Sequence, residues 1–477
     1  IRLSLVGSEM CIRDRSKTIV IVGAGFGGLT AAALLAQKGH KVTVLDQGSW
    51  VGGKSRRLQL AGQVIDSGPS LVTFPQVWNQ LLDKYKSLGG KVENEPKFLR
   101  LPEVGRYFFR GEQIDIPIPT NHPWYRAWER FVAEHAPLEA PIAELLTSHP
   151  LDTKTLGAVS KLLSVYKGKL NTKKYLDSLK WMPEGLRELI AIHTLNAGVA
   201  PDQTLPIYAS VTAVMSEQGI SVPVGGVNQL PQFLAELAIK AGADIQLGST
   251  VVSIKKGSVK TTKKTYECDI VISGVDNEIT QKLLTGKASS PARSRSCSGV
   301  AIYAVLNKPL PPSTVTHSVV MPDNPADLYS RLKANQQPDQ TMAFVNYYTA
   351  GNIYQNTRPT VAVLLTAAAD GQRADLSTPW VSKELDRISK VIGLDVRIDS
   401  LFESYEILHP QYFAGIGGPL GAIYGKKNPL WQSGPFHSPS YQSPLRPWLY
   451  RVGASVHPGG GMPAVMGGAM NAIRALL

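Results

Sequence analysis

Residues 17–46 read KTIVIVGAGFGGLTAAALLAQKGHKVTVLD, and this stretch decides the fold. A β-branched run at residues 18–22 predicts a buried parallel strand that leads directly into Gly-Ala-Gly-Phe-Gly-Gly at residues 23–28. A helical spacing of apolar residues follows, and a second strand at residues 41–45 ends on Asp46. A strand–turn–helix–strand unit with G-x-G-x-x-G at its first turn, and an acid about 20 residues on, predicts a dinucleotide-binding site.

Each part of this motif has a physical reason. Gly23 permits the tight turn, Gly25 has no Cβ and lets a pyrophosphate approach the backbone, and Gly28 lets helix and strand pack closely. The start of the helix offers free N–H groups to the phosphates, and Asp46 can accept hydrogen bonds from a ribose diol. Without this context, G-x-G-x-x-G is weak evidence, because an ordinary glycine-rich turn has the same composition.

Two segments after the second strand narrow the choice of cofactor. Residues 51–55 read VGGKS, and residues 65–70 read IDSGPS. With the first motif, they resemble the glutathione-reductase-like FAD proteins, in particular the phytoene dehydrogenase (carotenoid desaturase and isomerase) family. The resemblance implies an FAD cofactor and a contact between the flavin side of that cofactor and Gly53 and Lys54.

The C-terminal block is a second strong signal. Residues 453–465 read GASVHPGGGMPAV and precede a small-residue helix predicted over residues 466–477. This string resembles the C-terminal signature of bacterial-type phytoene dehydrogenases, with Val456 where the family usually has Thr. The resemblance also implies a backbone contact from Val251 or Val252 to the adenine. The predicted cofactor-binding residues are Gly23, Ala24, Gly25, Gly27, Gly28, Asp46, Gly53, Lys54, Val251, Gly453 and Met462.

The two motifs at opposite ends of the chain predict a discontinuous domain. The expected class is α/β, with a glutathione-reductase-like FAD-binding Rossmann domain interrupted by an inserted α+β substrate domain. We assign residues 16–75, 219–285 and 440–477 to the FAD-binding domain, and residues 76–218 and 286–439 to the substrate-binding or lid domain. Residues 1–15, IRLSLVGSEMCIRDR, look like translated adapter sequence, and we expect an artefactual or disordered extension.

Several elements are expected between the motifs. We predict an amphipathic helix over residues 74–88, a hairpin of residues 106–110 with 114–118, and a strand over residues 260–266. Residues 123–218 are helical, and their apolar stripes favour core packing over a lid that faces lipid. His317 and His457 resemble family histidines, for which we expect structural roles; no catalytic side chain is singled out and no metal site is predicted.

Composition limits partners and location. The formal net charge is +13, with 50 Lys and Arg against 37 Asp and Glu, and lysines cluster at 167–174, 255–264 and 426–427. Solvated loops account for such clusters, and attraction to anionic lipid headgroups is the alternative; no nucleic-acid-binding module accompanies them. Three separated cysteines favour a reducing compartment. We therefore expect a cytoplasmic protein, peripheral at the inner face of the membrane, of unknown oligomeric state.

The family resemblance implies an FAD-dependent oxidoreductase in carotenoid biosynthesis. The expected reaction is desaturation of a long apolar polyene, with hydride transfer to flavin N5. Three alternatives stay open: a carotenoid isomerase or saturase, an amine-oxidase-like flavoenzyme, and a non-catalytic lipid-binding protein that keeps FAD as a structural element.

Overall fold

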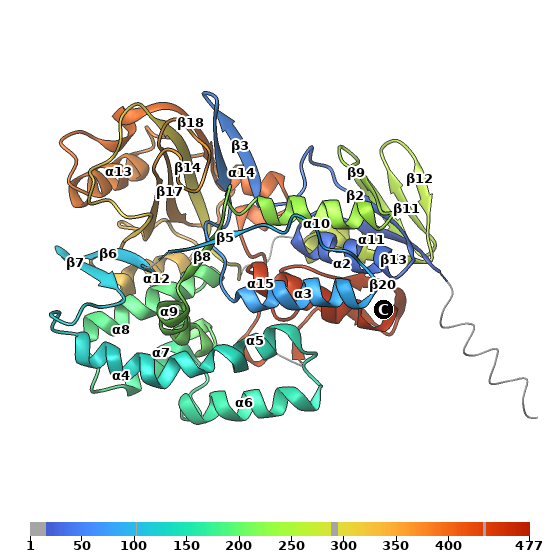
Figure 1. Cartoon of the computed structure of the whole chain (residues 1–477), viewed down its shortest axis with the longest axis horizontal. Helices are drawn as coiled ribbons and strands as arrows, with labels where there is room; N and C mark the ends of the chain where they lie inside the picture. The colour runs from blue at the N-terminus through green and yellow to red at the C-terminus, as the bar shows by residue number, and fades with distance from the viewer. Residues whose placement is uncertain (1–15, 102, 288–293, 433–435) are drawn as a thin grey trace, which may run out of the picture.

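The computed structural model describes residues 16–101, 103–287, 294–432 and 436–477, so the predicted N-terminal extension lies outside the described residues. The chain forms two halves that lie side by side (Figure 1). One half is built around a six-stranded sheet, and the other around a seven-stranded sheet that faces a group of helices.

The six-stranded sheet has the strand order β19-β20-β13-β1-β2-β9. Its strands are β1 (Thr18–Val22), β2 (Lys41–Leu45), β9 (Asp244–Gln246), β13 (Ile270–Ser273), β19 (Gln442–Ser443) and β20 (Arg446–Arg451). β1 is central and pairs in parallel with β2 and β13, so that Ile21 lies opposite both Val44 and Ile272. Strands from both ends and the middle of the chain therefore share one sheet, which is the discontinuous Rossmann arrangement that the sequence predicts.

The two faces of this sheet are covered differently. Ile19 and Ile21 face a core shared with the helices α2 (Phe26–Gln37), α3 (Pro75–Ser87), α10 (Gln229–Lys240) and α15 (Met462–Ala472). Val20 and Val22 face a three-stranded sheet of β10 (Val251–Lys255), β11 (Ser258–Thr261) and β12 (Thr265–Glu267). Because alternate residues of a strand point to opposite faces, an unbroken apolar run fits a strand buried on both sides.

The seven-stranded sheet is antiparallel except where β15 pairs with β6. In the order β18-β14-β17-β16-β15-β6-β7, its strands are Phe402–Leu408, Ser298–Leu306, Thr360–Ala367, Ala343–Tyr348, His317–Val320, Gly105–Phe109 and Glu112–Ile116. On β14, Tyr303 and Val305 face the helical side, whereas Ile302 and Ala304 face α13 (Pro379–Val391). The predicted hairpin is thus confirmed as β6 and β7.

A helical group covers the inner face of this sheet (Figure 1). It comprises α4 (Tyr125–His135), α5 (Glu139–Thr147), α6 (Thr153–Val165), α7 (Thr172–Ser178), α8 (Glu184–Ala191) and α9 (Ile207–Gln218). Trp128, Phe131 and Leu162 are buried, as core packing predicts, whereas Leu163 is exposed. The shorter helices elsewhere are α11 (Asn277–Thr285), α12 (Pro325–Lys333) and α14 (Pro410–Gly415). In the described part of the chain, no helix has the length and hydropathy to cross a bilayer.

The packing departs from the predicted domain boundary at residue 75. The apolar face of α3, which we assigned to the substrate domain, packs in the same core as α2 and α15. The hairpin of β3 (Arg56–Leu60) and β4 (Gln63–Ser67), which we assigned to the FAD-binding domain, buries Leu58 and Ile65 in the core of the other half. Burial partners decide this assignment, and sequence order does not reveal them. A second two-stranded pairing joins β5 (Phe98–Leu101) to β8 (Ile220–Pro223).

Two predicted elements are wrong in detail. The single strand expected over residues 260–266 is split: its first two residues end β11, its last two begin β12, and residues 262–264 form the turn between them. The hydroxyl of Thr261 holds this turn by accepting from the N–H groups of Lys263 and Lys264. The C-terminal helix begins at Met462, four residues before its predicted start. Pro463 is compatible with that start, because the first turn of a helix needs no intrahelical N–H donor.

Candidate functional site

The first glycine turn lies where β1 meets α2. Gly23 has φ +103°, a conformation that favours glycine, and its N–H donates to the carbonyl of Leu45 at 2.8 Å. A Cβ on Gly28 would lie 2.0 Å from the carbonyl oxygen of Gly23, so only glycine fits at this helix–strand contact. The positions that we predicted for the tight turn and for close packing have these roles.

Gly25 tests whether the turn fits a dinucleotide. It is the N-cap of α2, with φ −77°, and a Cβ built there would meet no atom within 4 Å. The first turn of α2 carries no acidic residue, and no side chain caps its N–H groups. Open space over free N–H groups at the positive end of a helix dipole suits a pyrophosphate, so the backbone of residues 25–28 fits the predicted group.

Asp46 lies at the end of β2, beside this turn. Its carboxylate accepts from the N–H groups of Ala24 and Gly48, each at 2.7 Å, and its carbonyl accepts from Ser249 at 2.7 Å. The side chain is therefore fixed, and each oxygen keeps a lone pair for a further donor. The bond from Ser249 also brings the start of β10, with Val251, toward the end of β2. The predicted ribose and adenine contacts of Asp46 and Val251 stay predictions.

The Gly-Gly-Lys segment folds back onto the same turn. Gly52 donates to the carbonyl of Ala24 at 2.8 Å, and a Cβ on Gly53 would lie 3.2 Å from Cα of Gly25. The ammonium of Lys54 donates to the carbonyl of Ile423. Water reaches this side chain, but the surrounding protein desolvates it and lowers the pKa of the ammonium, although Asp276 opposes the shift.

The two distant glycine-dense turns touch each other. A Cβ on Gly27 would lie only 3.0 Å from the backbone nitrogen of Gly453, and α2 packs against α15. Met462 is buried as the first residue of α15, whose N-cap, Gly461, would place a Cβ in open space. This second helix start also lacks an acidic residue in its first turn. The structure thus brings residues 23–28, 52–54, 453 and 462 together, as the sequence predicts.

Residues that we did not predict as cofactor-binding complete the junction. The ring of Tyr424 lies between Gly198 and Gly460, because a Cβ on either glycine would fall within 2.8 Å of that ring. Burial raises the pKa of the Tyr424 phenol, which therefore stays neutral. Asp276 caps α11 through the N–H of Glu278 and accepts from the Ser455 hydroxyl at 3.2 Å. Gly460 belongs to the predicted C-terminal motif, but the sequence pattern did not indicate its contact with Tyr424.

A partly buried ion pair ties the β3–β4 hairpin to the segment before α10. Arg57 donates to both oxygens of Asp66, at 2.8 and 3.1 Å, and the N–H of Asn228 donates to the same carboxylate at 2.9 Å. The hydroxyl of Tyr354 accepts from the N–H of Asp66 at 3.2 Å. Burial raises the pKa of Asp66 although Arg57 opposes the shift. The sequence segment 65–70 pointed to this region, but not to its partners.

The two histidines lie in structural surroundings. Burial lowers the pKa of His457 to about 4, and its ring lies against His437 and Tyr441. His317 starts β15 and is buried; its ring approaches the backbone of Ser70, but neither ring nitrogen reaches hydrogen-bond geometry. Burial lowers its pKa to about 4, so it stays neutral at pH 7.

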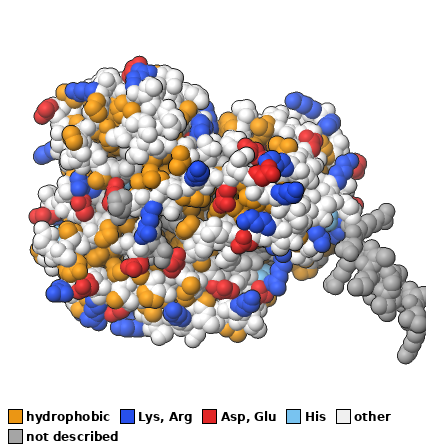
Figure 2. All heavy atoms as spheres, in the orientation of Figure 1, with side chains coloured by type: hydrophobic (Ala, Val, Ile, Leu, Met, Phe, Trp, Pro, Cys, Tyr) orange, Lys and Arg blue, Asp and Glu red, His pale blue; other side chains and the backbone are white. Residues whose placement is uncertain are grey.

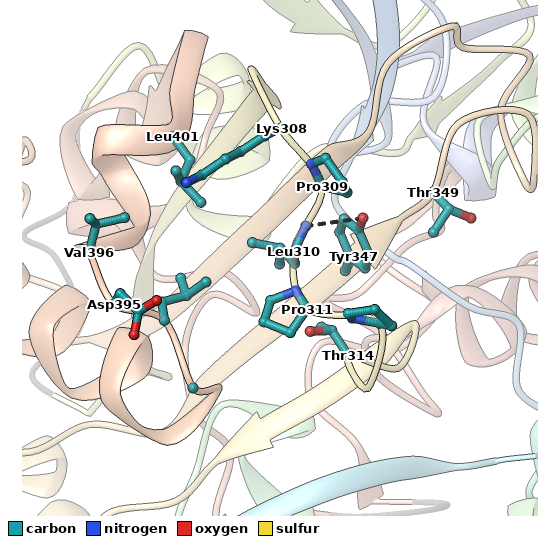
Figure 3. A pocket seen from close by; sticks show the side chains of 13 residues that line it. Lys308, Pro309, Leu310, Pro311, Thr314, Tyr347, Thr349, Asp395, Val396 and Leu401 are labelled. Atoms are coloured by element: carbon teal, nitrogen blue, oxygen red, sulfur yellow. Dashed lines mark hydrogen bonds between the residues drawn. The ribbon is translucent and has the colours of Figure 1, made fainter.

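A pocket of about 480 Å³ lies elsewhere, on the side of the seven-stranded sheet that α13 covers (Figure 3). Leu310 and Leu401 line it, and the N–H of Leu310 donates to the hydroxyl of Tyr347 at 3.2 Å. None of its 13 lining residues belongs to either glycine turn. The sheet separates this pocket from the helical side, so we do not assign it to the dinucleotide site.

The fold and the joined glycine turns define a dinucleotide-binding oxidoreductase of the Rossmann class. The family model described as "Flavin containing amine oxidoreductase" matches residues 26–385, and the chain belongs to this family. It is an FAD-dependent oxidoreductase, and the backbone turns at residues 23–28, 52–54 and 453–462 fit such a cofactor.

Relatives match along nearly the whole chain. It is 24% identical to the 1-hydroxycarotenoid 3,4-desaturase of Flavobacterium sp., over 94% of this chain and 96% of the relative. It is 25% identical to the zeta-carotene-forming phytoene desaturase of Myxococcus xanthus, over 96% and 93%. The structure of wild-type putrescine oxidase bound to putrescine matches with a TM-score of 0.64 at 16% identity, over 97% of this chain and 98% of that one, which supports the fold alone. The predicted resemblance to carotenoid desaturases is confirmed.

Proposed function

We propose that the protein dehydrogenates a long apolar polyene of the carotenoid type. The observation that carries this proposal is the end-to-end similarity to two carotenoid desaturases, in a chain whose first and last glycine turns meet. Beside the second turn, the ring of Tyr424 lies next to Gly460 and stays a neutral phenol, which agrees with an apolar substrate.

The chain's own residues bind and orient. The glycine turns would hold the cofactor, and the side chain of Lys54, which donates to the carbonyl of Ile423, would contact the flavin side of that cofactor. When bound, FAD supplies the oxidising chemistry by accepting a hydride equivalent from the substrate. The proton of the neighbouring carbon would pass to the reduced cofactor, so that both hydrogens removed from the substrate are accounted for. Positive charge that is delocalised along a polyene reduces the need for a strong protein base. Tyr424, a protonated phenol beside Gly460, would form one wall of the site.

Phytoene supplied to the purified, FAD-loaded protein under anaerobic conditions tests this proposal. We expect loss of the oxidised flavin absorbance together with products that carry additional conjugated double bonds, separated by chromatography. A change of isomer without new double bonds, with cis-lycopene or phytoene, would instead support the isomerase. Hydrogenated products, formed when the bound flavin is first reduced with dithionite, would support a saturase. Flavin that no polyene reduces would leave the lipid-binding alternative.

Amine oxidation is the second candidate, because the matching family model is named for it. A cationic amine needs a free carboxylate or an aromatic cage. Two acids close to the turns, the buried Asp66 and the half-buried Asp276, already hold donors from the protein. We therefore expect no hydrogen peroxide from putrescine or spermidine, and a peroxide-coupled assay that detects turnover would reverse this ranking.

We also propose a location at the cytoplasmic face of the membrane. The support is indirect: three separated cysteines, an excess of basic residues and a lipophilic substrate class. Fractionation of cells that produce the protein, with a salt wash of the membranes, tests this location.

A further inference from the structure

Helix α6 presents an unusual outer surface. The described part of the chain exposes fifteen large apolar side chains, and five of them lie within the twenty residues from 151 to 170. They are Leu151, Leu156, Val159, Leu163 and Leu170, exposed by 75, 67, 39, 47 and 68%. Single exposed leucines are common, but such a concentration on one short segment marks an interaction surface.

The geometry of α6 explains this exposure. Thr155, Ala158 and Leu162 form its buried side, which packs against α5, and the helix lies at the edge of the molecule (Figure 1). Leu156 and Leu163 are seven residues apart and therefore share one side of the outward half. Lys154 and Lys161, also seven apart, occupy the opposite flank of that half. The outward side of α6 is thus divided into an apolar flank and a basic flank.

The charge around these leucines is strongly positive. Residues 151–180 contain seven lysines and two aspartates. Asp152 pairs with Arg474 at 2.7 Å and Asp177 with Lys173 at 2.6 Å, so neither acid is available to the other lysines. Lys167, Lys169 and Lys174 are exposed and have no ion pair with the described residues. Along the lower edge of the molecule in Figure 2, where α6 lies, basic and apolar side chains adjoin.

We infer that the α6 surface, defined as Leu151, Leu156, Val159, Leu163 and Leu170 with Lys167, Lys169 and Lys174, docks on a lipid bilayer that contains anionic headgroups. Apolar side chains beside unpaired lysines match the boundary between acyl chains and phosphates. A second copy of this chain fits poorly, because a symmetric contact through this surface would bring its unpaired lysines together.

This surface lies one helix from the candidate site. A Cβ on Gly467 of α15 would lie 2.0 Å from the carbonyl oxygen of Leu146, so α5 rests directly on the helix that follows the second glycine turn. Docking through α6 would hold the site close to a bilayer that dissolves a polyene. Only this use of the surface rests on the proposed function; docking itself is independent of the reaction.

Co-sedimentation of the FAD-loaded protein with vesicles tests the inference. The vesicles are pure phosphatidylcholine, or phosphatidylcholine with 30 mol% phosphatidylglycerol as the anionic probe, at low and high salt (a roughly tenfold range, which shortens the Debye length about threefold). One variant reverses Lys167, Lys169 and Lys174 to Glu. A second changes Leu156 and Leu163 to Ser. Matched controls reverse the exposed Lys255, Lys256 and Lys260 of the β10–β11 hairpin, and change the exposed Ile239 of α10 to Ser.

We expect the wild type to bind the anionic vesicles, and to bind less at high salt. Reversal of the three α6-surface lysines should weaken binding by about 100-fold, at roughly fivefold for each lysine removed from the headgroup region. The leucine variant should lose at least about tenfold on both kinds of vesicle, while the controls keep wild-type binding. Retained flavin absorbance and melting temperature identify variants that have stayed folded.

Three results would overturn the inference: no binding by the wild type, equal binding by the α6 variants and the wild type, or equal losses in the controls. A dimer seen by light scattering that the leucine variant dissociates, without vesicle binding, would assign the surface to a second copy. The readout is binding alone, so failure of the proposed reaction would leave this result unchanged, and the reverse also holds.

Discussion

Two glycines in one turn are predicted to fail in different ways when alanine replaces them. In Gly28→Ala, the new methyl group would lie 2.0 Å from the carbonyl oxygen of Gly23 and 3.2 Å from its carbonyl carbon. Both atoms belong to the backbone, so the helix and strand must separate. Overpacking of this kind costs about 3 kcal/mol or more, which lowers the melting temperature by about 3 °C if the whole chain unfolds as one unit.

In Gly25→Ala, the methyl group meets no protein atom within 4 Å, and φ of −77° suits alanine. The lost preference for glycine at an N-cap and the smaller entropy of the unfolded chain oppose each other at about 0.5–1 kcal/mol each, so stability stays nearly constant. The methyl group does occupy the approach of the pyrophosphate. A contact penalty of about 2 kcal/mol weakens FAD binding about 30-fold.

Flavin absorbance and thermal melting of the two purified variants, each with and without added FAD, separate these effects. Gly25→Ala should be folded and depleted of FAD, and Gly28→Ala should be poorly soluble or melt early even when FAD is abundant. The reasoning fails if Gly25→Ala keeps wild-type affinity for FAD, or if Gly28→Ala is as stable as the wild type.

Three further predictions concern stability. Asp66→Ala removes the partner of Arg57, whose side chain is 26% exposed. The free energy of unfolding, measured by denaturant titration, should fall by about 2–3 kcal/mol. A decrease under about 1 kcal/mol would contradict this prediction. Burial lowers the pKa of His135 to about 3 in the native state. Below about pH 6.5 the unfolded state therefore binds a proton at this residue, whereas the native state stays neutral. His135 alone should therefore lower the free energy of unfolding by about 2 kcal/mol between pH 7 and 5. His135→Phe should make the measured slope shallower by about that amount, while His317 and His457 keep their own contributions. Gly157→Ala, exposed and unobstructed on α6, should raise stability by about 0.5–1 kcal/mol without changing vesicle binding.

Local sequence patterns were sufficient to predict the part of the site that is built from residues close together in the sequence. The run at residues 18–22, the spacing of Gly23, Gly25 and Gly28, and an acid at the end of the next strand are consequences of one βαβ unit. The C-terminal glycine turn was predicted in the same way. The need for glycine in a tight turn is set by the local backbone conformation, so the sequence alone can indicate it.

Partners from distant segments were outside the reach of sequence pattern. Nothing local to Tyr424 indicates that its ring fills the space between Gly198 and Gly460, and nothing local to Asp66 indicates Asn228 or Tyr354 as its partners. These contacts depend on how two sheets and their connections pack together.

The sequence by itself determined a discontinuous Rossmann domain with glycine turns at both ends of the chain, because strand pairing and tight turns are encoded by short-range residue types. Only the tertiary structure decided that Gly27 meets Gly453, that α3 belongs to the core of the first half, and that Leu163 of α6 is exposed while Leu162 is buried. Periodicity indicates which side of a helix is apolar, but burial depends on which other element lies against that side.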